Sequence, residues 1–107
     1  GLSVLGQFLA TGVGRYVDVI SYHLYTGHKP PEQMFGMVTI LKRLMRENGL
    51  EGKPIWNTEF GWLVEGAGRA IDPSAVGFAK SAKVYSDAEA AAFVVRAYII
   101  MASEGVE

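Results

Sequence analysis

The chain of 107 residues contains no cysteine, which excludes a disulfide framework and a thiolate metal site. It also has no strongly basic patch, because 10 Lys and Arg residues nearly balance 11 Asp and Glu residues. The densest basic group, Lys42, Arg43 and Arg46, has the spacing of a solvated helix face, so nucleic acid is not expected as a partner. A chain without cysteine is compatible with a reducing cytosol and with an extracellular enzyme that has no disulfide bonds, so the compartment is left open.

A long hydrophobic run is also missing. The longest, residues 90–102, is interrupted by Arg96 and falls short of the roughly 20 residues that a membrane-spanning helix needs. Residues 1–5 have neither an initiator methionine nor the basic start of a secretory signal, and they open directly in a helical pattern. We therefore expect a soluble piece of a longer protein, without a membrane partner. For the whole protein, a secreted or periplasmic location is compatible with the sequence.

The residues that are present predict a packed α/β fold, since 50% are hydrophobic and 20% charged. Residues 16–25, YVDVISYHLY, are β-branched and aromatic without strict polar alternation, which indicates a strand of a parallel sheet buried on both faces. Residues 54–60 are expected to form a second strand, bracketed by Pro54 and Gly61. Between the two strands, an apolar stripe predicts an amphipathic helix over residues 32–48, and the three elements together make a βαβ unit. The stripe comprises Met34, Met37, Val38, Leu41, Leu44 and Met45.

The second half of the chain contains one expected loop and one expected helix. Residues 62–85 show no sustained periodicity, and a loop of this length in a compact domain usually has a function. Ser86 and Glu89 have the spacing of a capping box, which predicts a helix over residues 87–104 that ends at Gly105. A further strand is expected to begin at residues 105–107.

Glu59 stands at the carboxyl end of the second strand, where α/β folds collect ligands and catalytic groups. Alternation along a strand places Ile55, Asn57 and Glu59 on one face, with Trp56 and Phe60 on the other. We expect the bulkier faces to pack on helices, so that Trp56 lies in the core. If the strands are parallel neighbours, the remaining faces bring His23, Tyr25 and Glu59 together.

The two strand segments, YVDVISYHLY and KPIWNTEFGW, resemble the sixth and seventh strands of retaining glycoside hydrolases of clan A, the cellulase-like (β/α)8 barrels. The first has the His-x-Tyr ending of their sixth strand, and the second ends in the glutamate of their seventh. The resemblance implies that residues 1–107 are a fragment of a single catalytic barrel, a partial TIM barrel made of about the sixth and seventh βα units. A complete barrel takes about 250 residues.

The resemblance also implies roles for individual residues. Glu59 would be the nucleophile that forms a covalent glycosyl-enzyme intermediate on a β-linked poly- or oligosaccharide. Tyr25 would donate its hydroxyl to the Glu59 carboxylate, and His23 would line the sugar subsite. For Trp62, just past the nucleophile, the alternatives are stacking on a sugar ring and packing under the long loop.

One part of the family pattern is missing. Retaining hydrolysis needs a second carboxyl as general acid/base, which in clan A follows an asparagine, but neither Asn48 nor Asn57 is followed by glutamate. The isolated chain is therefore expected to be inactive. Two other interpretations stay open: a non-catalytic module that binds carbohydrate or assembles as a half-barrel, and an unrelated α/β domain in which Glu59 is a surface residue.

No cofactor or metal is expected. His23 and His28 have no third ligand at metal-binding spacing, and the glycine pairs at Gly12 and Gly14 and at Gly66 and Gly68 lack the third glycine of a dinucleotide fingerprint. The sequence leaves the sugar, the linkage, exo or endo action and the oligomeric state open.

Overall fold

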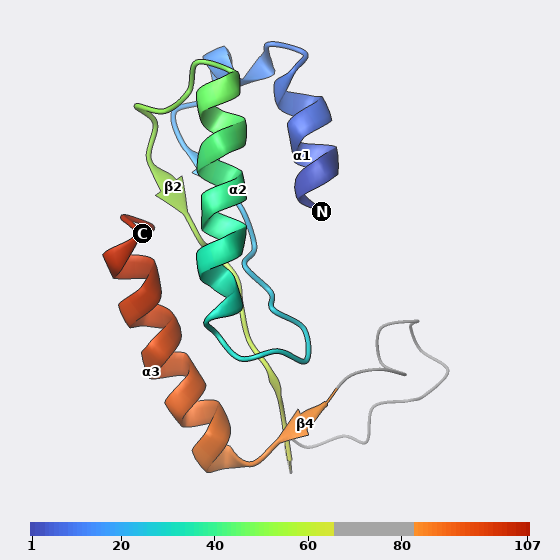
Figure 1. Ribbon diagram of the computed structural model, residues 1–107, viewed down its shortest axis with the longest axis vertical. Helices are drawn as coiled ribbons and strands as arrows, with labels where there is room; N and C mark the ends of the chain where they lie inside the picture. Colours follow the sequence, from blue (N-terminus) through green and yellow to red (C-terminus); the bar gives the residue numbers. More distant parts are fainter. Residues whose placement is uncertain (66–82) are drawn as a thin grey trace.

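The computed structural model of the protein describes residues 1–65 and 83–107 (Figure 1). In chain order its elements are α1 (Leu2–Leu9), the 3-10 helix η1 (Val13–Tyr16), β1 (Ile20–Ser21), α2 (Gln33–Glu47), β2 (Ile55–Trp56), β3 (Leu63–Val64), β4 (Val84–Tyr85) and α3 (Asp87–Ser103). Both long helices were predicted from the sequence, and each matches its expected bounds to within one residue at either end.

The predicted βαβ unit is present. Strands β1 and β2 are parallel neighbours, with Ile20 opposite Ile55 and Ser21 opposite Trp56, and α2 connects them. Backbone hydrogen bonds run from Ile20 N to the Pro54 carbonyl and from Tyr22 N to the Trp56 carbonyl, both at 3.0 Å. Because the strands are parallel, their carboxyl ends lie at the same edge of the sheet.

A third segment pairs with the other edge of β2. Val106 forms a parallel bridge with Ile55, Glu107 N donates to the Ile55 carbonyl at 2.9 Å, and Asn57 N donates to the Glu107 carbonyl at 2.7 Å. Gly105, whose φ of 65° is in the left-handed region that favours glycine, turns the chain out of α3 into this bridge. A strand pairing was expected to begin here, and β2 consequently lies between β1 and residues 106–107.

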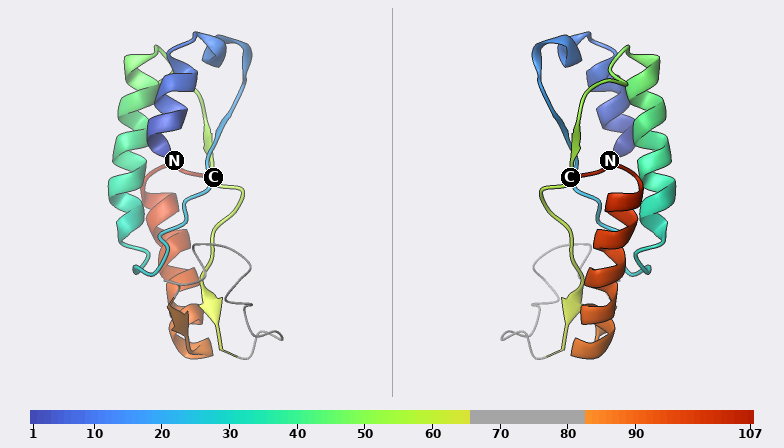
Figure 2. Two further views of the ribbon diagram at one scale, coloured as in Figure 1. Left: turned by 90° about the vertical axis from the view of Figure 1, so that its right-hand side faces the viewer. Right: turned by 90° about the vertical axis from the view of Figure 1, so that its left-hand side faces the viewer.

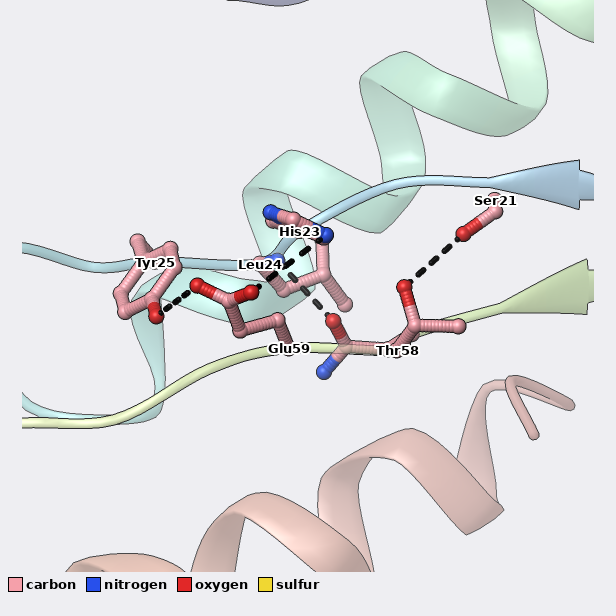
Figure 3. Close-up of polar contacts among 7 residues, drawn as sticks. Ser21, His23, Leu24, Tyr25, Thr58 and Glu59 are labelled. Atoms are coloured by element: carbon pink, nitrogen blue, oxygen red, sulfur yellow. Dashed lines mark hydrogen bonds and ion pairs between the residues drawn. The ribbon is translucent and has the colours of Figure 1, made fainter.

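The ladder strands are shorter than residues 16–25 and 54–60. Val13–Tyr16 forms a 3-10 helix, so the predicted strand is wrong at its start, and ladder pairing covers only Ile20–Ser21 and Ile55–Trp56. The physical reason is that β-branched and aromatic residues favour extended backbone, whereas a ladder also requires a neighbour whose carbonyl groups are in register. Beyond Tyr22 the two segments stay side by side without regular ladder bonds (Figure 3).

The expected loop of residues 62–85 contains strands at both of its ends, which corrects that prediction. Leu63 pairs with Val84 and Val64 with Tyr85 in a parallel pair, and Glu65 N donates to the Tyr85 carbonyl at 2.9 Å. Two-residue strands are too short for a periodic pattern to reveal them. The middle of the expected loop, residues 66–82, lies outside the described residues.

The core fills the space between one face of the β1–β2 pair and the helices. Figure 2 shows α2 and α3 on the same side of this pair. Buried side chains come from all of these elements: Ile20, Leu24, Met34, Val38, Leu41, Met45, Ile55, Ala97, Ile100 and Met101. Four residues of the predicted α2 stripe are buried, and the other two, Met37 and Leu44, are partly buried and pack against the core.

Trp56 does not belong to this core, contrary to expectation. Its side chain is 45% exposed, whereas Ile55 is 6% exposed and packs in the core. Ile20 and Ile55 lie opposite each other and face the helices, so Ser21 and Trp56 face the other side of the sheet. The size of the side chains therefore does not determine which face of the sheet is buried. The buried face is the one on which α2 and α3 pack.

Helix α3 begins with the predicted capping box. Ser86 Oγ accepts from Glu89 N at 3.3 Å, and Glu89 Oε2 accepts from Ser86 N at 3.1 Å, so two backbone donors that have no partner inside the helix are satisfied. We expect Ser86→Ala to lower the free energy of unfolding by about 1 kcal/mol, the usual cost of losing such a cap. Urea unfolding at neutral pH measures this difference; an unchanged midpoint would contradict it.

The same contact makes the effect depend on pH. Hydrogen bonds from Ser86 hold the pKa of Glu89 below its usual 4.5. A pKa that is lower in the folded state gives stability that is present above pH 4.5 and is lost as the pH falls through the folded value. The stability difference between the wild type and Ser86→Ala should therefore shrink in acid.

Candidate active site

His23, Tyr25 and Glu59 come together where β1 and β2 end (Figure 3). The Tyr25 hydroxyl donates a hydrogen bond to Glu59 Oε1 at 2.5 Å, a length typical of an O–H donor and an ionised carboxylate. His23 Nε2 lies 4.0 Å from the other carboxylate oxygen, Oε2. The structure thus brings three of the four sequence-predicted site residues into one cluster.

Strict alternation along the second strand, which was expected, does not hold at Glu59. It placed Glu59 on the same face as Ile55 and Asn57, but Ile55 is buried in the core and the Asn57 amide donates to Met101 Sδ of α3 at 2.9 Å. Those side chains are on the helix side of the sheet, whereas Glu59 is on the opposite side with Tyr25. Regular pairing ends at Trp56, and strict alternation is not required of a chain that has left the ladder.

Thr58 marks the point at which the alternation breaks. Its hydroxyl is 3.1 Å from the Ser21 hydroxyl, on the open face of the sheet (Figure 3). Glu59 is the next residue along the chain and yet reaches Tyr25 on that same face. Two consecutive side chains therefore point to one side, and this places the carboxylate beside the phenol.

Electrostatics keeps the phenol in its donating form. The hydrogen bond to Glu59 is the main cause that raises the pKa of Tyr25 above its usual 10.0, with smaller contributions from burial and from the nearby negative charge. A phenolate beside a carboxylate would be repelled, so Tyr25 stays protonated throughout the neutral range. It remains a hydrogen-bond donor to Glu59 at the pH at which most enzymes work.

The cluster is open to solvent. The side chains of His23 and Glu59 are 51% and 58% exposed, so a ligand can approach the carboxylate. The His23 ring stands edge-on to the Tyr25 ring, with centroids 6.2 Å apart and planes at 76°. This edge-to-face contact is a favourable arrangement for two aromatic rings, and it helps to orient both side chains beside Glu59.

Trp62 occupies a different position. Its indole N–H donates to Thr26 Oγ1 at 3.1 Å and to the Lys29 carbonyl at 3.0 Å, and its ring packs edge-to-face on Phe60 and Phe93. Among the described residues it makes no hydrogen bond to His23, Tyr25 or Glu59. Trp62 ties the loop after β1 to α3. Both alternatives considered for it, packing under the long loop and stacking on a sugar ring, stay predictions, because residues 66–82 lie outside the described residues.

Sequence reasoning assigned no structural role to Asn57. Its Oδ1 accepts a hydrogen bond from Leu24 N at 3.1 Å, next to Tyr25. The available signal was an asparagine directly after the apolar residues Ile55 and Trp56, because asparagine is depleted in strands. A polar side chain in such a position needs a partner, and here it finds one on the neighbouring segment.

Within residues 1–65 and 83–107, no three His, Asp or Glu side chains form a group that could hold a metal ion. In the same part of the chain no helix combines the length and the apolar character needed to cross a bilayer.

No family model, no curated protein and no solved structure matches this chain.

Proposed function

We propose that the chain contributes the nucleophile of a retaining glycoside hydrolase and that Glu59 is this nucleophile. The observation that carries the proposal is the 2.5 Å hydrogen bond from Tyr25 to Glu59 at the carboxyl ends of two parallel strands. Its support is the combination of this geometry with the resemblance of residues 16–25 and 53–62 to the sixth and seventh strands of clan A barrels. In such folds the carboxyl ends of the strands form the catalytic face.

The reaction proceeds in two displacements. Glu59 Oε2, the oxygen that does not accept from Tyr25, attacks the anomeric carbon; the glycosidic C–O bond breaks, and a glycosyl ester forms. The leaving oxygen takes a proton from a carboxylic acid. Water, deprotonated by the same carboxyl group, then attacks the anomeric carbon and releases Glu59, so the sugar keeps its configuration.

Two groups of this chain support the nucleophile. Tyr25 holds Oε1 and stabilises the negative charge on the carboxylate before attack and again when Glu59 departs in the second step. His23 lines the sugar subsite beside Oε2. The second carboxyl group comes from another part of the barrel, and the isolated chain is accordingly expected to be inactive.

The open face of the sheet supports a role within a larger barrel. Trp56 and Tyr25 are 45% and 46% exposed there, and Ser21 and Thr58 are exposed as well. In a closed (β/α)8 barrel this face would be the interior, filled by side chains of the other strands. The central position of β2, between β1 and residues 106–107, matches the sequential parallel order of such a barrel.

Covalent labelling of the full-length protein tests the assignment. We expect 2,4-dinitrophenyl 2-deoxy-2-fluoro-β-glucoside, or the corresponding β-mannoside, β-xyloside or β-cellobioside, to inactivate the enzyme. The fluorine slows both displacements and the good leaving group rescues the first, so the glycosyl ester accumulates. Peptide mass spectrometry should locate the sugar on Glu59, and labelling of another residue would overturn the proposal.

A second candidate is a non-catalytic module that binds carbohydrate. The observation in its favour is that neither asparagine of the chain precedes a glutamate, so the chain itself supplies only one carboxyl of the required pair. Isothermal titration with cello-oligosaccharides, followed by product analysis, separates the two candidates. Binding without hydrolysis and without labelling of Glu59 by any of the four fluoroglycosides would favour the module.

A further inference from the structure

The pairing of β1 with β2 changes character just before the active site. Backbone bonds run from Ile20 N to the Pro54 carbonyl and from Tyr22 N to the Trp56 carbonyl, so a regular ladder would continue from Leu24 N to the Thr58 carbonyl. Leu24 N instead donates to the side-chain oxygen of Asn57, at 3.1 Å. The Asn57 amide thus replaces one rung of the ladder.

This replacement has two consequences for the site. It holds the backbone of Leu24, the residue between His23 and Tyr25, against the strand that carries Glu59. It also releases the backbone at Thr58 and Glu59 from the ladder, so that both side chains can turn to the open face, where Glu59 meets Tyr25. A regular rung at Thr58 would preserve the alternation and direct the carboxylate towards the helices.

Asn57 is itself fixed from the other side. Its Nδ2 donates to Met101 Sδ at 2.9 Å, and Met101 is a buried residue of α3. The amide therefore spans from the packed core to the end of β1. Because its own position is determined by the core, it can determine the position of Leu24.

We propose that Asn57 is a positioning residue for the nucleophile, and that its side-chain amide sets the distance between Tyr25 and Glu59. The proposal rests on the proposed function of Glu59. A displacement of about 1 Å is enough to break a short hydrogen bond and can lower a rate strongly even when the displaced group does not touch the substrate. The simpler alternative is that Asn57 only satisfies its own polar atoms and packs on Met101.

The test uses the full-length protein with Asn57→Leu, which keeps the approximate shape of the side chain and removes both the acceptor and the donor. We expect kcat to fall about fivefold to tenfold, the effect of losing one supporting hydrogen bond, while KM stays within about twofold because Asn57 does not bind the sugar. Asn57→Asp keeps an oxygen that can accept from Leu24 N and should restore most of kcat.

A second readout does not depend on activity. Tyr25 titrates above its usual value because of its hydrogen bond to Glu59, so separating the two residues should lower the pKa of Tyr25 towards 10 in Asn57→Leu. The titration can be followed by NMR of ¹³C-labelled tyrosine, with the Tyr25 signal assigned from Tyr25→Phe. If Asn57→Leu does not fold, Asn57→Ser is used in its place. The serine side chain is shorter than that of asparagine, so its hydroxyl should not reach Leu24 N.

One control variant separates positioning from general damage. Asn48→Leu makes the same substitution at the other asparagine, whose amide donates to the Leu44 carbonyl at the end of α2, and it should leave the Tyr25 titration and kcat close to the wild type even where it lowers stability. Met101→Leu tests the anchor of Asn57, because it conserves volume and removes the sulfur acceptor of Asn57 Nδ2. It should move the Tyr25 titration and kcat in the same direction as Asn57→Leu but by less, since Leu24 N keeps its acceptor.

The outcomes are distinct. An unchanged Tyr25 titration in the Asn57 variant, or an equal change in Asn48→Leu, would overturn the positioning role. Failure of the proposed function would be seen separately, as fluoroglycoside labelling at a residue other than Glu59. In that case the tyrosine titration would still decide whether Asn57 sets the Tyr25 to Glu59 distance.

Discussion

Replacing Glu59 with alanine in the full-length protein is expected to lower kcat on the order of 10⁴-fold or more, because the covalent intermediate can no longer form. Sodium azide should restore part of the activity. The anion fits the space left by the carboxylate and attacks the anomeric carbon from the same side as Glu59 would. With a β-glycoside as substrate, the product should be an α-glycosyl azide, which NMR identifies by its anomeric coupling.

The configuration of this product distinguishes the two carboxylate roles. Loss of an acid/base carboxyl also permits azide rescue, but the azide then attacks the glycosyl-enzyme and gives a product of retained configuration. A β-azide from Glu59→Ala would therefore show that Glu59 is the acid/base. The matched control is Glu51→Ala, an exposed glutamate in the turn before β2, at the opposite end of the strand, which should keep wild-type kcat.

Features encoded by neighbouring residues could be predicted from the sequence. The apolar stripe of α2 repeats at helical spacing and lies against the core, and the capping box of α3 involves residues only three positions apart. The parallel pairing of β1 and β2 followed from the length of the helix between them, since a parallel pair needs a crossover. None of these inferences required knowledge of which surfaces meet.

The covered face of the sheet could not be predicted in this way. Alternation tells which side chains share a face but not which face the helices cover, and both Ile55 and Trp56 are apolar enough for a core. Size favoured Trp56, but the helices lie over Ile55. In the same way, Leu63–Val64 and Val84–Tyr85 are strands only because they pair with each other, and residues 65–83 separate them in the sequence.

The meeting of Tyr25 and Glu59 was predicted by an argument that the structure only half supports. Both residues follow the ends of parallel strands, which was sufficient to bring them to one edge. They lie on the same face of the sheet because alternation breaks at Thr58, where two consecutive side chains point to one side. At this point the Asn57 side chain, and not a backbone carbonyl, accepts from Leu24 N. Period-two reasoning assumes a regular ladder, so it cannot detect such a break.

Tyr25→Phe is expected to lower kcat/KM by about 10-fold to 100-fold, which corresponds to the loss of a hydrogen bond to a charged group. The ring of phenylalanine fills the same space, so the His23 contact and the fold should persist. Most of the loss should appear in kcat, because Tyr25 contacts Oε1 of Glu59, the proposed nucleophile, and not the sugar. Steady-state kinetics with an aryl β-glycoside measures both parameters.

The same variant should change stability in alkali, with a defined sign. The pKa of Tyr25 is raised in the folded state, so its hydrogen bond contributes stability that is present below about pH 10 and is lost as the pH rises through the folded value. The wild-type protein should thus lose its stability advantage over Tyr25→Phe above pH 10. The difference is small because solvent screens a residue that is 46% exposed.

Tyr16→Phe is the control for the kinetic effect, since Tyr16 is 74% exposed and belongs to η1, away from Glu59. Equal kinetic losses in both variants would show that removal of a surface hydroxyl, and not support of Glu59, lowers the rate.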